Sequence, residues 1–301
     1  MPRRRLPLVP QFTALREEST FVDLQGVTIH TYRWKPGKPT GVVLIVHGLG
    51  EHALRYEHVA QRLVQAGYAV WALDQRGHGA TGIEKHGGDL AKLGRLGPGG
   101  MRAVVGDLVN VLRRIRAEHP ELPVGIIGHS WGSLVTQMLL STRAELVDAA
   151  VLSGTAYSMP GWVNAGDLNA RHVHLGDSGF EWLSRDQAVI DAFVADPLTF
   201  AAKPAKSFGI VEGLRLYQVP SKRIPPELPL LIAGGSDDSM AGPKSLRRLG
   251  EAYARRGVTD VTVKIYPGAR HEIFNEINKA KVLDDLVAWL DAKLAPSGRT
   301  E

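Results

Sequence analysis

The segment Gly128-His129-Ser130-Trp131-Gly132 is where the types and spacing of the residues could carry out chemistry. A short apolar run at 124–127 precedes this G-x-S-x-G motif, and an amphipathic stretch at 134–139 follows it. A serine at a sharp turn between a buried strand and a helix holds its hydroxyl above the sheet, exposed as a nucleophile. An incidental serine in a glycine-rich turn is the alternative, and the strand–turn–helix context disfavours it.

A serine hydroxyl is a weak nucleophile until a base removes its proton, so the chain must also supply a histidine and an orienting acid. Asp238 follows the apolar run at 230–233, and His271 follows the run at 261–266. Parallel strands bring their carboxyl ends to one edge of a sheet, where these side chains would meet. We expect Ser130 as nucleophile, His271 as base and Asp238 as orienting acid, in the chain order of the α/β-hydrolases.

The negative charge that develops on the substrate carbonyl needs backbone N–H donors, an arrangement called an oxyanion hole. One donor should be Trp131, which directly follows the nucleophile. The other should come from the loop His47-Gly48-Leu49-Gly50, which follows the apolar run at 41–46. We expect Leu49 to be that second donor.

The rest of the chain alternates short apolar runs with amphipathic helical patterns. Strands are predicted at 21–24, 27–34, 41–47, 69–73, 124–127, 149–152, 230–233 and 261–266, and the clearest helix at 101–115. The first two runs flank Gln25-Gly26, a plausible hairpin turn. The alternation predicts an α/β fold of the α/β-hydrolase type: a mostly parallel sheet flanked by helices, with the antiparallel hairpin at its edge.

Residues 155–226 break this alternation, because no buried strand appears among them. The segment is rich in aromatic residues, glycine and proline, and it is too long for a simple loop. We predict a helical cap at 155–226, inserted into a core formed by 1–154 and 227–301. Its candidate substrate-binding residues are Trp162, Trp182, Phe193 and Phe208.

Composition excludes several classes of protein. The chain has 301 residues and no cysteine, which excludes disulfide scaffolds, thiolate metal sites and a cysteine nucleophile. Lys and Arg exceed Asp and Glu by 36 − 31 = 5, but the basic residues are dispersed, so no nucleic-acid partner is expected. No apolar run reaches the ~18 residues of a membrane span. Met1–Arg5 is basic but no signal-peptide apolar core follows it, so the cytoplasm is the expected location.

Histidine spacing gives no sign of a metal site. His172 and His174 form an isolated H-x-H pair without an evident third ligand, whereas zinc needs three or four. We therefore expect no bound metal.

At these residues the sequence resembles the monoacylglycerol lipase and lysophospholipase-like branch of the serine α/β-hydrolases. The matching pieces, spread over 22–290, are 47–52 with Arg55-Tyr56, 74–79, the serine motif, 184–186, 196–198, 235–238, 266–268, His271-Glu272 and Asn275-Glu276. The resemblance implies an ester hydrolase without a cofactor, acting on a small-molecule ester of a single acyl chain under a helical cap. Such an enzyme could contact lipid surfaces transiently. The oligomeric state is not indicated.

The sequence also departs from that branch. Ser130–Ser133 reads Ser-Trp-Gly-Ser where the branch usually has Ser-Met-Gly-Gly, and Ser239-Met240 replaces a proline and an aliphatic residue. The bulky Trp131 could narrow an acyl pocket, and the centre of the cap, 157–179, matches poorly.

Other functions remain open on the same residues. An aminopeptidase or amidase could use this triad, with Glu181, Asp186 or Asp191 binding a substrate ammonium group. An acyltransferase and a hydrolase-fold ligand-binding receptor are the further alternatives.

Two adjacent aspartates compete for the role of the acid, and Asp238 is predicted over Asp237 because it is the fourth residue of the branch's G-S-x-D pattern. Asp238→Asn should lower kcat by up to about 10⁴-fold, as in other triads, and Asp237→Asn should have a far smaller effect. Steady-state ester hydrolysis by the two variants tests this assignment. The reverse ranking would overturn it.

Overall fold

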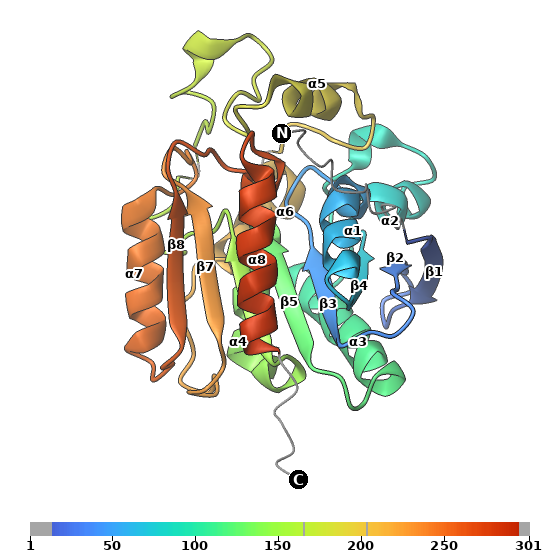
Figure 1. The fold of residues 1–301 in the computed structure, drawn as a ribbon. Helices are drawn as coiled ribbons and strands as arrows, with labels where there is room; N and C mark the ends of the chain where they lie inside the picture. Colours follow the sequence, from blue (N-terminus) through green and yellow to red (C-terminus); the bar gives the residue numbers. More distant parts are fainter. Residues whose placement is uncertain (1–13, 165, 203, 295–301) are drawn as a thin grey trace, which may run out of the picture.

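The computed structural model describes residues 14–164, 166–202 and 204–294, so the basic segment Met1–Arg5 lies outside the described residues. Its centre is an eight-stranded sheet in the order β1-β2-β4-β3-β5-β6-β7-β8 (Figure 1). The strands are β1 (Arg16–Val22), β2 (Thr28–Trp34), β3 (Gly41–Val46), β4 (Tyr68–Leu73), β5 (Val124–His129), β6 (Ala149–Ser153), β7 (Leu230–Gly235) and β8 (Val261–Tyr266). The β1–β2 and β2–β4 pairs are antiparallel and the other pairs are parallel.

Every predicted strand is present, and the predicted hairpin lies at the edge of the sheet. The turn passes through Gly26, whose φ of 73° lies in the left-handed region that glycine adopts without strain. Strand β1 begins at Arg16, five residues before the apolar run that predicted it. An edge strand that is largely exposed needs no apolar side chains, so its first half carried no hydrophobic signal.

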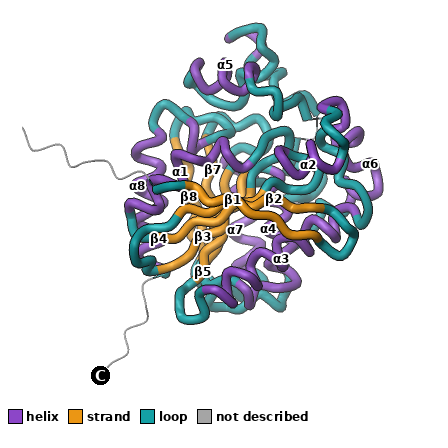
Figure 2. Tube along the Cα trace, turned by 90° about the vertical axis from the view of Figure 1, so that its right-hand side faces the viewer, coloured by secondary structure: helices purple, strands orange, loops and turns teal. Residues whose placement is uncertain are grey.

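Helices cover both faces of the sheet (Figures 1 and 2). Helices α1 (Glu57–Gln65) and α8 (Lys279–Lys293) pack on one face, and α3 (Gly100–Glu118), α4 (Trp131–Arg143) and α7 (Pro243–Ala254) pack on the other. Alternate side chains of a strand point to opposite faces, so Val42 and Leu44 contact one helical layer while Val43 and Ile45 contact the other. Burial on both faces explains why β3 is a continuous apolar run.

The remaining short helices lie in the connections. They are α2 (Gly79–Lys85) and the 3₁₀ turns Ala53–Tyr56, Leu90–Lys92, Ala144–Leu146, Val173–Leu175 and Ile273–Asn275.

Between β6 and β7 the chain leaves the sheet and runs across its carboxyl edge (Figure 1). This inserted segment contains α5 (Gln187–Ala195) and α6 (Pro204–Leu214), and none of its described residues forms a strand. Long irregular stretches separate the helices, so it is less helical than predicted. Helix α6 is bent at Gly209, where φ is 75°.

Polar contacts attach the inserted segment to the core at several places, of which three illustrate the spread. His52 Nε2 lies 2.7 Å from Asp196 Oδ2, and the Glu212 carboxylate accepts a hydrogen bond from the Met101 N–H. Arg185 Nε donates to Glu276 Oε2 over 2.9 Å.

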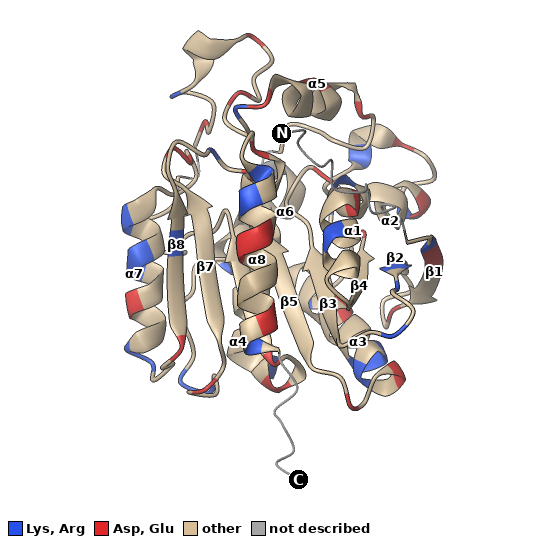
Figure 3. Cartoon of the chain, viewed as in Figure 1, with Lys and Arg blue, Asp and Glu red and all other residues tan. Residues whose placement is uncertain are grey.

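Charged side chains of both signs lie on the surface helices α3, α7 and α8 (Figure 3). Over the residues that the structure describes, no helix is both long enough and apolar enough to cross a membrane.

Close packing around the serine motif explains its second glycine. A Cβ atom at Gly132 would overlap the backbone carbonyls of Val46 and His47 at the end of β3. Strand β3 can therefore approach the first turn of α4 only because residue 132 has no side chain.

Gly132→Ala should lower the free energy of unfolding by about 1–3 kcal/mol, because backbone atoms cannot move aside as a flexible side chain would. The matched control is Gly106→Ala in α3, where an added Cβ has no heavy atom within 4 Å. That change should raise stability by about 0.5–1 kcal/mol through helix propensity. Urea unfolding measures both, and a Gly132→Ala protein as stable as the parent would refute the packing argument.

Candidate active site

Ser130 occupies the turn between β5 and α4 in a strained backbone conformation. Its φ of 52° and ψ of −125° make it the only non-glycine residue with positive φ among the described residues. Hydrogen bonds fix the turn: the Ser130 N–H donates to the Ser153 carbonyl over 2.9 Å, and the Ser133 hydroxyl donates to the Ser130 carbonyl over 2.6 Å. Such strain, of order 1–3 kcal/mol, persists only where the surrounding structure enforces it.

The structure brings His271 and Asp238 into direct contact. His271 Nδ1 lies 3.1 Å and 3.0 Å from the two carboxylate oxygens of Asp238, and both side chains are almost completely buried. The Met240 N–H donates to Asp238 Oδ1 over 2.8 Å and fixes the orientation of the carboxylate. Asp237 instead points outward, with 38% of its side chain exposed and an ion pair to Arg171. Of the two adjacent aspartates, Asp238 is the one in contact with the histidine.

The surroundings of His271 favour its protonated form. Burial lowers the pKa of His271, but the carboxylates of Asp238, Glu272 and Glu51 outweigh this effect and raise the pKa above its ordinary value. The ring packs against Trp182 and His129, with centroid distances of 4.7 Å and 4.9 Å. Burial lowers the pKa of His129 well below its usual value, so this neighbour is neutral.

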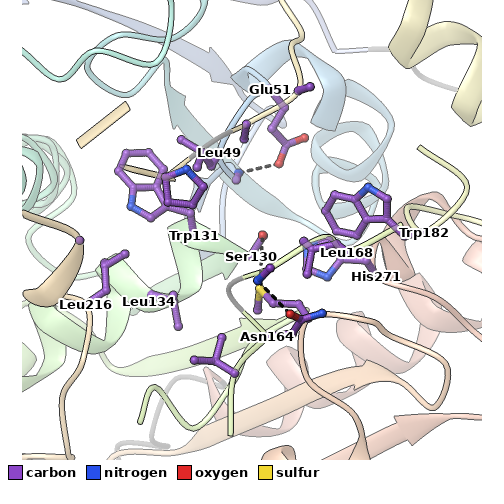
Figure 4. A pocket seen from close by; sticks show the side chains of 18 of the residues that line it. Leu49, Glu51, Ser130, Trp131, Leu134, Asn164, Leu168, Trp182, Leu216 and His271 are labelled. Atoms are coloured by element: carbon purple, nitrogen blue, oxygen red, sulfur yellow. Dashed lines mark hydrogen bonds between the residues drawn. The ribbon is translucent and has the colours of Figure 1, made fainter. Parts of the chain in front are cut away.

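The Ser130 hydroxyl faces Met240, whose Sδ lies 4.0 Å from Oγ. Within the described chain, the buried Nε2 of His271 has no hydrogen-bond partner. Ser130 and His271 line the same cavity without a hydrogen bond between them (Figure 4). The sequence marked Met240 as unusual for the branch but gave it no role.

The predicted oxyanion donors lie at the same cavity. Leu49 and Trp131 both line it (Figure 4). The Gly48 N–H is already occupied, because it donates to Glu51 Oε1 over 2.5 Å. The Gly48 N–H is therefore not available to a substrate, and Leu49 stays the predicted donor of this loop.

The cavity has a volume of about 740 Å³, and both the core and the inserted segment line it. Apolar side chains form most of one wall, namely Leu49, Trp131, Leu134, Phe200, Phe208 and Leu216. Asn164, Asp167 and Asn169 supply polar groups elsewhere in the lining.

Three of the four aromatic residues predicted to bind substrate line this cavity: Trp182, Phe193 and Phe208. Trp162 is placed differently. Its ring packs against Tyr157 and lies under the guanidinium of Arg248, and 38% of the residue is exposed. Trp162 therefore lies outside the cavity, since its apolar surface is used in packing the inserted segment onto α7.

A column of four rings joins the inserted segment to the serine motif. Phe200 stacks on His78, His78 on Trp131 and Trp131 on Phe208, with centroid distances of 5.5, 5.3 and 5.3 Å. The Trp131 ring therefore packs between His78 and Phe208, next to Ser130.

Two further sets of side-chain contacts lie near the site. The Asp74 carboxylate accepts hydrogen bonds from the Ala53 and Ala80 N–H groups and so holds the two segments beside it. The contact of Arg55 with Glu272 was missed, because 217 residues separate the two and no local pattern connects them.

Ser130 lies on a strained turn, and His271 and Asp238 form a buried pair. All three side chains lie at the carboxyl edge of a mostly parallel sheet. Together these features define a serine α/β-hydrolase. A family model described as serine aminopeptidase, S33, matches residues 37–278. A monoacylglycerol lipase of Mycolicibacterium smegmatis is 34% identical over 294 residues, which cover 94% of this chain and 99% of that protein. A monoglyceride lipase of Rattus norvegicus is 27% identical and covers 99% of this chain and 96% of its own.

The solved structure of a thermostable carboxyl esterase from Bacillus coagulans shares the fold, with a TM-score of 0.82 at 22% identity over 93% of this chain and 99% of that one. The chain belongs to the serine aminopeptidase S33 family, and its resemblance to the monoacylglycerol lipase branch is confirmed. It is a carboxylic ester hydrolase. Although the family is described by an aminopeptidase, nothing in these comparisons favours the peptidase, acyltransferase or receptor alternatives.

Proposed function

We propose that this enzyme hydrolyses a monoacylglycerol or a similar ester of a single acyl chain, through an acyl-enzyme formed on Ser130. The observation that carries this proposal is the cavity itself. Ser130 opens into a space of about 740 Å³ that is lined mostly by apolar residues, with a few amide and carboxylate groups among them. Such a space suits a substrate with one hydrocarbon chain and a small polar alcohol.

The reaction would proceed in two steps on the proposed triad. The Ser130 hydroxyl rotates away from the Met240 sulfur and transfers its proton to Nε2 of His271. Ser130 Oγ attacks the carbonyl carbon of the ester. The N–H groups of Leu49 and Trp131 stabilise the oxyanion, while the Asp238 carboxylate stabilises the imidazolium. The C–O bond breaks as Nε2 returns the proton to the leaving alcohol. Water then attacks the acyl-enzyme by the same route and releases the carboxylic acid.

Chain-length preference would be determined at Trp131. The rings of His78 and Phe208 hold this side chain beside the nucleophile, where it occupies space that a smaller residue would leave to the acyl chain. We propose that residues 155–226 act as the cap over this chain. Trp182, Phe193 and Phe208 are its proposed substrate contacts.

The test is kcat/KM for nitrophenyl esters of two to sixteen carbons. Each buried methylene contributes about 0.8 kcal/mol, roughly fourfold in affinity, so kcat/KM should rise with chain length. The value of kcat/KM should reach a plateau at medium chain lengths, because Trp131 limits the space for the acyl chain. Trp131→Met keeps the backbone donor and should move the plateau to longer chains.

Ser130→Ala is the control, and it should abolish turnover of every ester while the protein stays folded. A maximum at acetate, or a profile independent of chain length, would contradict the acyl pocket. Near-normal turnover by folded Ser130→Ala would contradict the mechanism.

We further propose that the enzyme touches lipid surfaces transiently through α6. Its Ile210, Val211 and Leu214 are 76%, 66% and 59% exposed, and Ile210 and Leu214 also border the cavity. Val211→Asp should weaken co-sedimentation with phosphatidylcholine vesicles and leave hydrolysis of a soluble acetate ester unchanged. The control is Val22→Asp, at an equally exposed position on edge strand β1, which should leave vesicle binding intact. Equal binding by all three proteins would exclude α6 as the contact.

A further inference from the structure

A buried arginine connects the two loops that carry opposite halves of the catalytic machinery. Arg55 Nη1 lies 2.5 Å from Glu51 Oε2 and 2.7 Å from Glu272 Oε1, and Arg55 Nη2 lies 2.8 Å from Glu272 Oε2. All three side chains are nearly inaccessible, at 4% for each glutamate and 11% for the arginine. The two glutamates themselves line the active-site cavity.

Each end of this ion-pair network lies next to a group that acts on the substrate. Glu51 Oε1 accepts the Gly48 N–H over 2.5 Å, directly before the proposed oxyanion donor Leu49. Glu272 directly follows His271, and its second oxygen accepts from the Asn275 amide over 2.8 Å. The planar fork of Arg55 thus fixes the oxyanion loop relative to the histidine loop, with bidentate geometry on the histidine side.

The network also carries a net negative charge. Burial and the nearby Glu272 carboxylate raise the pKa of Glu51 above its ordinary value. Three donors, from Gly48, Tyr56 and Arg55, nevertheless meet the Glu51 side chain, and this geometry suits a carboxylate. Burial raises the pKa of Glu272, but its ion pair with Arg55 outweighs this and lowers the pKa to about 2. With Glu51 ionised, two carboxylates and one guanidinium leave a charge of about −1 beside His271.

Stability alone does not account for such an arrangement. The cost of removing ions from water often exceeds the attraction that a buried ion pair gains, so apolar side chains of similar size serve as well or better in a core. The reacting imidazole differs from a core residue, because it becomes positively charged in both chemical steps.

We propose that Glu272 and Arg55 are positioning residues, whose ion pair with Glu51 holds the oxyanion loop against the histidine loop and stabilises the imidazolium of His271 through the excess negative charge. The inference rests on the proposed roles of His271 and Leu49. The other titratable groups that face His271 are Asp238, which remains the principal partner, and the neutral His129.

The direct test is the pH dependence of kcat/KM for Glu272→Gln, since its acid limb reports the base of the free enzyme. Removing one negative charge beside His271 should move this limb to lower pH, by roughly 0.5–1 unit. The plateau rate should fall about 10- to 100-fold, because the loops lose their alignment and the imidazolium loses stabilisation. The variant would therefore be slower than the parent yet keep its activity to a lower pH.

Two further variants separate the effect of the charge on His271 from the effect of the alignment of the two loops. Arg55→Lys keeps the positive charge but loses the fork, so the rate should fall while the acid limb stays in place. Glu276→Gln changes a buried glutamate of the same loop, one that holds Arg185 and the Arg270 N–H and does not contact His271. Any loss of rate in Glu276→Gln should leave the acid limb of the pH profile in place.

The histidine can also be observed without turnover, by titrating isotopically labelled His271 in NMR spectra of the parent and of Glu272→Gln. This measurement distinguishes failure of the inference from failure of the proposed function, since it needs no ester. A downward shift in both readouts supports the proposal. An unchanged acid limb, or an unchanged NMR titration in folded Glu272→Gln, would overturn it.

Discussion

The site depends on one backbone constraint, the left-handed conformation of Ser130 between β5 and α4. The strain, about 1–3 kcal/mol, is maintained because both flanking elements are buried in the core and the end of β3 packs against Gly132. This conformation places the hydroxyl at the cavity and makes Trp131 the first residue of α4, where its N–H needs no helical partner. The proposed nucleophile and one proposed oxyanion donor therefore follow from a single turn.

The second constraint is electrostatic, because the site buries His271, the proposed base, which must become a cation during the reaction. Asp238 supplies the direct contact, and the carboxylates of Glu272 and Glu51, which Arg55 joins, also raise the pKa of His271. The inserted segment completes the enclosure: Trp182 covers His271, and Phe200 and Phe208 hold the rings beside Ser130. A low-dielectric enclosure of this kind strengthens each charge interaction inside it.

Much of this architecture could be predicted from local patterns. The buried strands are apolar on both faces, so β3 and β5 to β7 were evident, and the turn at Ser130 is flanked by glycines that sterics require. Loops that follow adjacent strands must meet, which placed Asp238 near His271. Contacts that depend on tertiary packing left no such signal. The position of Trp162 against Arg248 and the Arg55–Glu272 ion pair follow from neighbours remote in the chain. The exposed half of β1 carries no hydrophobic pattern because it lies at the edge of the sheet.

The central claim is that Ser130 forms the covalent intermediate. The most direct measurement is to inactivate the enzyme with an alkyl organophosphonate, weigh the intact protein and map the modified peptide by mass spectrometry. The account predicts one adduct per chain, located on Ser130, with activity lost in proportion to the modified fraction. An adduct on another residue that accounts for the inactivation, or full ester turnover by protein modified at Ser130, would contradict it.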